Sequence, residues 1–88
     1  MNINVYGNTL FAMSVRSVIG SRAWSLDGGS LYSSDGDLCI PVFPSGKTAD
    51  DAARDAYGCS LEIDGEFYGA SSCYYAIDPD GGSKEIAF

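Results

Sequence analysis

Residues 48–58, with the sequence TADDAARDAYG, constrain the fold most because their start signal, periodicity and stop signal agree. Thr48 and Asp51 have the spacing of a capping box, in which two side chains satisfy free N–H groups of the first helical turn. Ala and Tyr then recur at the spacing that lines one helical face, and Gly58 stands where helices commonly end. The pattern predicts a helix over residues 48–57 with an alanine face.

A helix of about three turns is marginal in water by itself, so packing must stabilise this one. Alanine allows close approach to a flat apolar surface, and a β-sheet formed by the rest of the chain would supply it. We therefore expect an α+β fold: an antiparallel, hairpin-rich sheet, the Ala-faced helix packed on it, and a second short helix near residues 15–22. Eighty-eight residues, 45% of them hydrophobic, suit one compact domain over residues 1–88.

Turn signals divide the first half of the chain into short strands. Gly7-Asn8 lies between residues 2–6 and 9–15, which predicts an N-terminal hairpin with Tyr6 opposite Thr9. Asp and Gly clusters at 27–29 and 34–37 predict a meander of strands from residue 23 to residue 43. Pro41 lacks an N–H group, so its strand is expected at a sheet edge or with a bulge.

Asp64-Gly65 is the strongest hairpin signal in the sequence. Pairing Ile63 with Glu66 sets Leu61 opposite Tyr68, and a last short strand is expected over residues 83–88.

Residues 66–77 are expected to form one long strand with an aromatic pair near each end, Phe67-Tyr68 and Tyr74-Tyr75. Because neighbouring side chains of a strand point to opposite faces, each sheet face receives aromatic rings. One face belongs in the core. The other is either an adhesive patch for a partner or is packed beneath residues 15–47.

The residue types that serve most enzymes are missing. The chain has no His, which removes the usual general base and the commonest metal ligand. Its three Cys are odd in number and have no CxxC spacing, so reduced thiols are expected rather than disulfides. We expect no enzyme and no catalytic residue.

Two segments resemble ligand-binding loops only in part. Residues 45–48, SGKT, look like the end of a phosphate-binding loop, but the first Gly of that motif would fall on Pro41. Residues 78–82, DPDGG, begin like a calcium loop, but Ser83 occupies the position of the required Gly. Capping and turn chemistry explain both, so no cofactor and no metal are expected.

The N-terminal sequence MNINVYGNTL lacks the basic and apolar regions of a secretory signal, and no apolar run is long enough to span a bilayer. A cytoplasmic protein without a membrane partner is expected.

Charge is distributed unevenly along the chain, whose net charge is −7. Residues 1–26 contain Arg16 and Arg22 and no acid, whereas residues 27–88 contain all twelve Asp and Glu with three basic residues. Such a surface repels nucleic acid and membranes and attracts a basic partner. The alternative explanation is that the charge serves solubility.

The chain resembles the small acidic proteins that phages and other mobile elements encode as anti-CRISPR inhibitors. The resemblance rests on the length, the negative charge, and the helix TADDAARDAYG followed by CSLEIDGEFYGA. It implies an inhibitor that acts as a nucleic-acid mimic: its acidic surface would occupy the basic nucleic-acid site of a CRISPR surveillance complex.

Acids that are close in sequence are the candidate partner-binding residues. Three lie on the predicted helix and three in the following hairpin: Asp50, Asp51, Asp55, Glu62, Asp64 and Glu66. The expected partner is a basic nucleic-acid-binding protein or complex, bound by a monomer or a weak homo-oligomer. The alternative is a small phage or bacterial structural or assembly protein that self-associates through β edges or an aromatic face.

Overall fold

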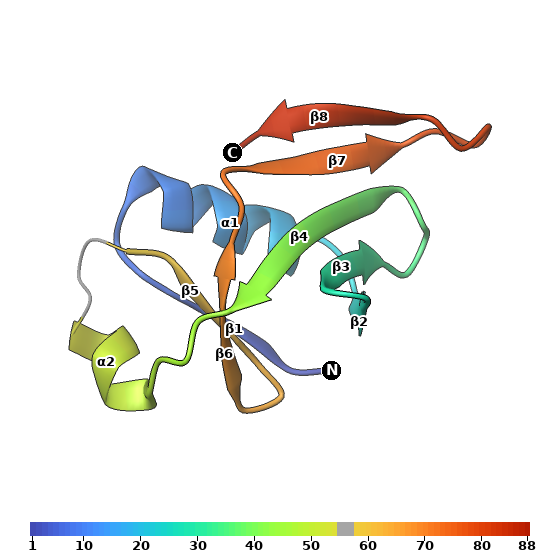
Figure 1. Cartoon of the computed structure of the whole chain (residues 1–88). Coiled ribbons are helices and arrows are strands. Elements are labelled where there is room, and N and C mark those ends of the chain that lie inside the picture. Colours follow the sequence, from blue (N-terminus) through green and yellow to red (C-terminus); the bar gives the residue numbers. More distant parts are fainter. Residues whose placement is uncertain (55–57) are drawn as a thin grey trace.

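The computed structural model describes residues 1–54 and 58–88, apart from the side chain of Ala53. It confirms the α+β class: an eight-stranded antiparallel sheet is combined with one helix of 11 residues and a short second helix (Figure 1). The elements in chain order are β1 (Ile3–Tyr6), α1 (Leu10–Gly20), β2 (Trp24–Asp27), β3 (Ser30–Ser33), β4 (Leu38–Pro44), α2 (Ala49–Arg54), β5 (Ser60–Ile63), β6 (Glu66–Ala70), β7 (Cys73–Ile77) and β8 (Ser83–Ala87).

Strand β4 is the centre of the sheet. One edge of β4 pairs with β3, while its other edge pairs with β7 near its start and with β6 near its end. The sheet therefore forks into two arms, β6-β5-β1 and β7-β8, which diverge in Figure 1. The meander predicted from residue 23 to residue 43 is confirmed as β2, β3 and β4.

Pro41 lies at this fork rather than at a sheet edge. Its carbonyl oxygen accepts a hydrogen bond from the Ser71 N–H at 3.2 Å, where the chain passes from β6 to β7. The nitrogen of Pro41, which carries no hydrogen, lies on the same side of β4 as this carbonyl group. It therefore faces the gap between β6 and β7, where no ladder hydrogen bond is lost. Residues 66–77 are accordingly two strands separated at Ser71-Ser72, and the prediction of one long strand was wrong.

The predicted N-terminal hairpin was wrong, because its second half is α1. Thr9 caps this helix by accepting a hydrogen bond from the Ala12 N–H at 3.0 Å. Ala12, Val15 and Ile19 follow at helical spacing and are buried, whereas alternation would have exposed every second apolar residue. The short helix predicted near residues 15–22 is the second half of α1.

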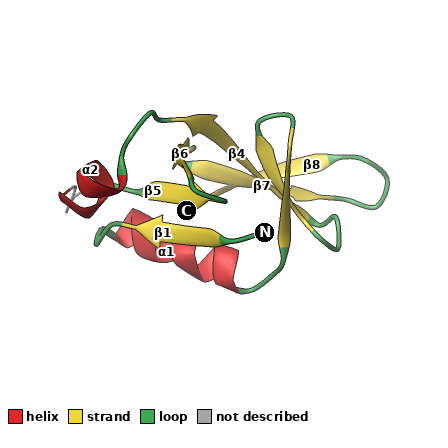
Figure 2. Cartoon of the chain, turned by 90° about the horizontal axis from the view of Figure 1, so that it is seen from below, coloured by secondary structure: helices red, strands yellow, loops and turns green. Residues whose placement is uncertain are grey.

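Helix α1 forms the core together with the sheet, and it lies along β1 (Figure 2). Val15, Leu31, Ile40 and Leu61 are fully buried between these layers. Trp24 closes the end of the helix: its indole N–H donates to the Ile19 carbonyl oxygen at 2.9 Å. A carbonyl group that the helix leaves unpaired is thereby satisfied by a buried side chain.

The capping box of α2 is confirmed. Thr48 Oγ1 accepts from the Asp51 N–H at 3.2 Å, and Asp51 Oδ2 accepts from the Thr48 N–H at 3.3 Å. The alanine face is only partly used, since Ala52 is buried while Ala49 is exposed. The helix that packs across the core is therefore α1, and residues 55–57, the predicted end of the second helix, lie outside the described part.

The hairpin at Asp64-Gly65 has the predicted register. Leu61 pairs with Tyr68 and Ile63 with Glu66. Both turn residues have positive φ, 49° at Asp64 and 91° at Gly65, as a two-residue hairpin turn requires.

Gly7 and Gly20 form a matched pair for testing the packing of β1 against the loop before β5. Gly7 has φ +134°, and a Cβ there would collide with the Gly58 carbonyl oxygen, whereas a Cβ at Gly20 would meet nothing. Gly7→Ala should therefore lower the free energy of unfolding by about 1–3 kcal/mol. Gly20→Ala, at the last residue of α1, should raise it by at most about 0.5–1 kcal/mol. Denaturant unfolding followed by circular dichroism measures both, and equal effects would contradict this packing.

Candidate functional site

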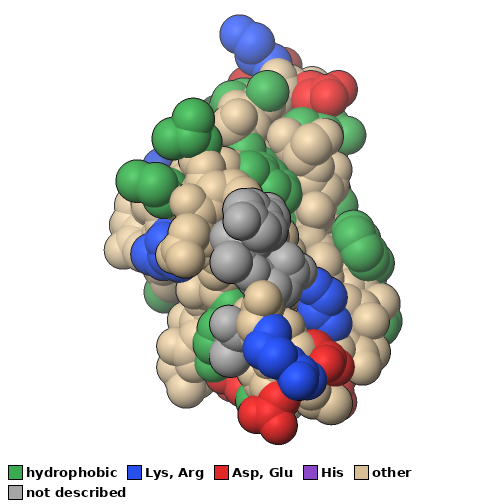
Figure 3. Space-filling model, turned by 90° about the vertical axis from the view of Figure 1, so that its left-hand side faces the viewer, with side chains coloured by type: hydrophobic (Ala, Val, Ile, Leu, Met, Phe, Trp, Pro, Cys, Tyr) green, Lys and Arg blue, Asp and Glu red, His purple; other side chains and the backbone are tan. Residues whose placement is uncertain are grey.

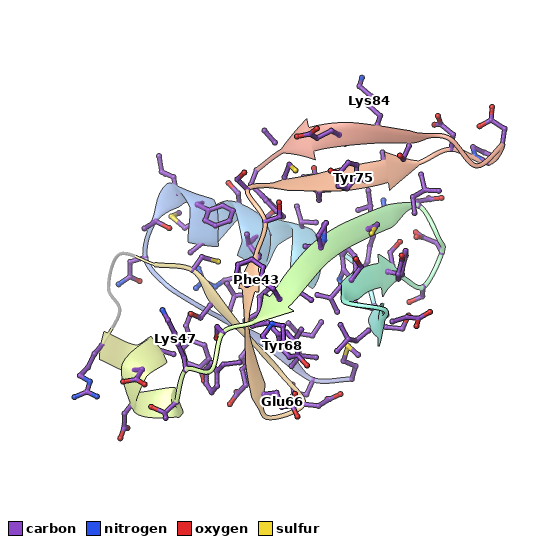
Figure 4. All side chains as sticks on the ribbon, viewed as in Figure 1. Phe43, Lys47, Glu66, Tyr68, Tyr75 and Lys84 are labelled. Carbon is purple, nitrogen blue, oxygen red and sulfur yellow. The ribbon has the colours of Figure 1, made fainter. Side chains whose placement is uncertain are left out.

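Three of the six predicted acidic residues lie together on the hairpin of β5 and β6. Glu62 belongs to β5, Asp64 to the turn and Glu66 to the start of β6, and Figure 4 shows Glu66 at the tip. The side chains of Asp64 and Glu66 are exposed, and Glu62 is half-buried. We call these three side chains the hairpin carboxylates.

Two of the hairpin carboxylates are held by strand β1 and by Asn2, the residue before it. Glu62 Oε1 accepts from Asn4 Nδ2 at 3.0 Å and from the Tyr6 hydroxyl at 3.4 Å. Asp64 Oδ1 accepts from the Asn2 N–H at 2.8 Å. These donors are neutral, so they orient the carboxylates without cancelling their charge.

The third carboxylate is held from within its own strand. The Tyr68 hydroxyl donates to Glu66 Oε2 at 3.0 Å, and this bond, with burial and the nearby charge, raises the pKa of Tyr68. Burial and then the charge of Glu62 likewise raise the pKa of Tyr6. Both phenols thus remain neutral donors over a wider pH range than a free tyrosine.

The acids of α2 have a different environment. Asp51 caps the helix and accepts from Arg54 at 3.3 Å. Its hydrogen bonds with Thr48 lower the pKa of Asp51, and Arg54 and Lys47 add to this effect. Asp50 is exposed, and Asp55 lies outside the described residues. Acidic and basic side chains lie beside one another at the lower end of the face in Figure 3.

The structure does not join the two acidic groups into one predicted patch. Helix α2 precedes the first residue of β5, whereas the turn with Asp64 follows its last residue, and the two stand apart in Figure 1. Asp50 and Asp51 therefore belong to a charge-mixed region, distinct from the hairpin carboxylates. Their assignment as partner-binding residues remains a prediction.

Sequence reasoning missed the residues that position the hairpin carboxylates. Asn2, Asn4 and Tyr6 reach them because β1 pairs with β5, with Asn4 opposite Glu62. No local signal reveals this pairing, because the two strands are separated by more than fifty residues in the chain.

The basic residues of the first half are engaged elsewhere. Arg22 pairs with Asp35 at 2.5 Å and with Asp37 at 3.6 Å. Arg16 donates to the carbonyl oxygens of Val5 and Gly7 at 3.0 and 3.1 Å. Within the described part of the chain, no ion pair reaches the hairpin carboxylates.

The aromatic pairs divide between two faces, as expected. Tyr68 and Tyr74 pack against the core. On the other face, Phe67 contacts Tyr6 with ring centroids 5.6 Å apart, and Tyr75 lines an open groove. Phe67 and Tyr75 are both half-buried on this face.

Two apolar residues near the N-terminus, Phe11 and Met13, have different environments. Phe11 packs against the core and against Phe88, with ring centroids 5.5 Å apart. Met13 points outward and is 55% exposed.

Metal ligands and membrane spans were sought across residues 1–54 and 58–88. Nowhere in these two ranges do three or more His, Cys, Asp or Glu side chains gather as metal ligands would. The same ranges contain no helix of the length and apolarity needed to cross a membrane.

Comparisons of the chain with known proteins were made at three levels. No family model, curated protein or solved structure is significantly similar to it. The function therefore has to be argued from the residues themselves.

The contact between Tyr68 and Glu66 can be tested by titration. Glu66→Gln keeps a hydrogen-bond acceptor but removes the charge, so the pKa of Tyr68 should fall towards its usual value. Carbon NMR of the tyrosine rings measures this directly. The pKa of Tyr6, which depends on burial and Glu62, should stay unchanged as the internal control. An unchanged pKa of Tyr68 would contradict the contact.

Proposed function

We propose that the protein is an acidic inhibitor that occupies the basic nucleic-acid-binding site of an effector protein. The hairpin carboxylates are its primary contacts and bind Lys and Arg side chains that otherwise bind phosphate. The resemblance to anti-CRISPR inhibitors suggests a CRISPR surveillance complex as the effector. The acids of α2 contribute longer-range attraction to this basic surface.

One observation carries the proposal: the hairpin carboxylates are oriented by neutral donors, with no ion pair among the described residues. A carboxylate that is already oriented loses little conformational freedom when a cation binds it. A carboxylate that is already ion-paired would first have to give up its partner. Glu62, Asp64 and Glu66 are thus better prepared for a basic partner than Asp35 or Asp51.

The alternative, self-association through β edges, is opposed at one edge strand. The guanidinium of Arg16 donates a hydrogen bond to the Val5 carbonyl oxygen of β1. This acceptor is therefore already used and is not free to pair with another strand. At another edge, β8 carries the exposed charged residues Lys84 and Glu85. Charged side chains on edge strands disfavour pairing with a second copy.

The decisive test compares two pairs of acidic residues on the same protein. Glu62→Gln/Glu66→Gln removes two charges from the hairpin but keeps hydrogen-bond acceptors there. Asp35→Asn/Asp37→Asn removes the same charge from two carboxylates that are already ion-paired with Arg22, and it is the control. Labelled target DNA is displaced from purified surveillance complexes by each variant, and fluorescence anisotropy gives the inhibition constant.

The hairpin variant should inhibit about five- to thirtyfold more weakly than wild type, since each of the two lost contacts is worth about 0.5–1 kcal/mol. The control variant should remain within about twofold. If both variants lose the same amount of inhibition, inhibition depends on net charge alone and not on the hairpin carboxylates. Failure of the wild-type protein to displace DNA from any complex would contradict the proposed function.

Oligomeric state separates the proposal from its alternative. An inhibitor that acts through exposed charge should sediment as a monomer at both low and high salt. Apolar self-association is not weakened by screening, so a homo-oligomer that persists in about 1 M salt would favour the structural or assembly protein. Sedimentation velocity across the salt range measures this.

A further inference from the structure

A second recognition feature lies on the other arm of the sheet, remote from the hairpin carboxylates. An open groove of about 410 Å³ crosses the outer face of β3, β4 and β7 and ends at the turn before β8. Tyr32 and Tyr75 line it on either side of Cys39, and Figure 4 shows Tyr75 on β7. Tyr32 is 38% exposed.

The pairing register brings these residues into one row. Tyr32 is opposite Cys39, Cys39 is opposite Tyr75, and Tyr75 is opposite Glu85. Directly paired residues of an antiparallel sheet point to the same face. With one strand between them, the backbones of the two tyrosines are about 10 Å apart, and Cys39, with its small side chain, is the residue between them.

Acidic residues flank this row: Glu85 is opposite Tyr75, and Asp27 is opposite Ser30, which also lines the groove. The pKa of Tyr32 is raised chiefly by Cys39 and additionally by the charge of Asp27. The pKa of Tyr75 is raised by its hydrogen bond with Cys73, and the charge of Glu85 contributes. Both carboxylates are therefore within electrostatic reach of the tyrosines.

The strands that form this face contain one basic residue, and it points to the other face. Lys84 is the only Lys or Arg in β2, β3, β4, β7 and β8. It is opposite Ala76, so it points to the face away from Tyr75 and Glu85, and it extends from the body of the molecule in Figure 4. The groove thus combines two aromatic walls with flanking acidic residues.

We propose that the groove binds an arginine side chain of the basic partner, with its guanidinium between Tyr32 and Tyr75. A guanidinium is planar, stacks on aromatic faces and is more weakly hydrated than an ammonium group. Asp27 and Glu85 favour a cation over a neutral planar group, and they repel the phosphates that accompany a nucleobase. The inference rests on the proposed function in that it names the residue type by which the partner is recognised.

The probe is N-acetyl-arginine N-methylamide, titrated into the isotope-labelled protein and followed by NMR. It should give saturable shifts at Tyr32, Cys39 and Tyr75. The citrulline analogue has nearly the same shape without the charge and should bind at least about fivefold more weakly. Tyr75→Leu should weaken arginine binding by roughly fivefold, the value of one cation–π contact. Phe43→Leu, an exposed aromatic outside the groove, is the matched control.

Glu85→Gln provides a second variant that preserves both rings, and it should weaken arginine binding but not citrulline binding. Equal binding of the two probes, or arginine shifts confined to Glu62, Asp64 and Glu66, would overturn the inference. The proposed function is judged separately: Glu62→Gln/Glu66→Gln should leave the groove shifts intact while DNA displacement becomes weaker. If the arginine probe does not bind the groove while the protein still displaces DNA, only the proposed arginine site is refuted.

Discussion

The pairing of β4 with three strands is the constraint on which the rest of the structure depends. Ile40 and Val42 of β4 are buried in the core. The edge of β4 that does not pair with β3 pairs with β7 near its start and with β6 near its end. Because Pro41 has no N–H to satisfy, the division costs no hydrogen bond at that position. The two arms that result carry the hairpin carboxylates and the tyrosine groove.

The described carboxylates are held in two different ways, by ion pairs or by neutral donors. Arg22 binds the acids of the turn between β3 and β4, and Arg54 binds Asp51 on α2. The hairpin acids are held only by amide, backbone and phenol donors among the described residues. Net charge alone therefore does not indicate where a basic partner would bind. The nature of the hydrogen-bond donors around each carboxylate does.

Features with local causes could be predicted from the sequence. The capping box of Thr48 and Asp51 and the register around Asp64-Gly65 depend on residues a few positions apart, and both are confirmed. The helical start at Thr9 was missed because Gly7-Asn8 also fits a hairpin turn. The local sequence is compatible with both a hairpin and a helix. The helix forms because it buries its apolar face against the sheet.

Features that depend on distant strands could not be predicted. The contact of Asn4 with Glu62 requires the β1–β5 pairing, and the row from Tyr32 to Tyr75 requires β4 between them. The same reason explains why the six acids were predicted as one group although α2 and the hairpin stand apart. Closeness in sequence is a weak guide to closeness on a forked sheet.

The salt dependence of binding tests the central claim most directly. The dissociation constant of the protein for a purified surveillance complex is measured across salt concentrations, for wild type and for Glu62→Gln/Glu66→Gln. If the hairpin carboxylates replace phosphates, wild-type affinity falls steeply with salt and the variant has a clearly shallower slope. Identical slopes would contradict the claim, because the hairpin carboxylates would then take no part in binding.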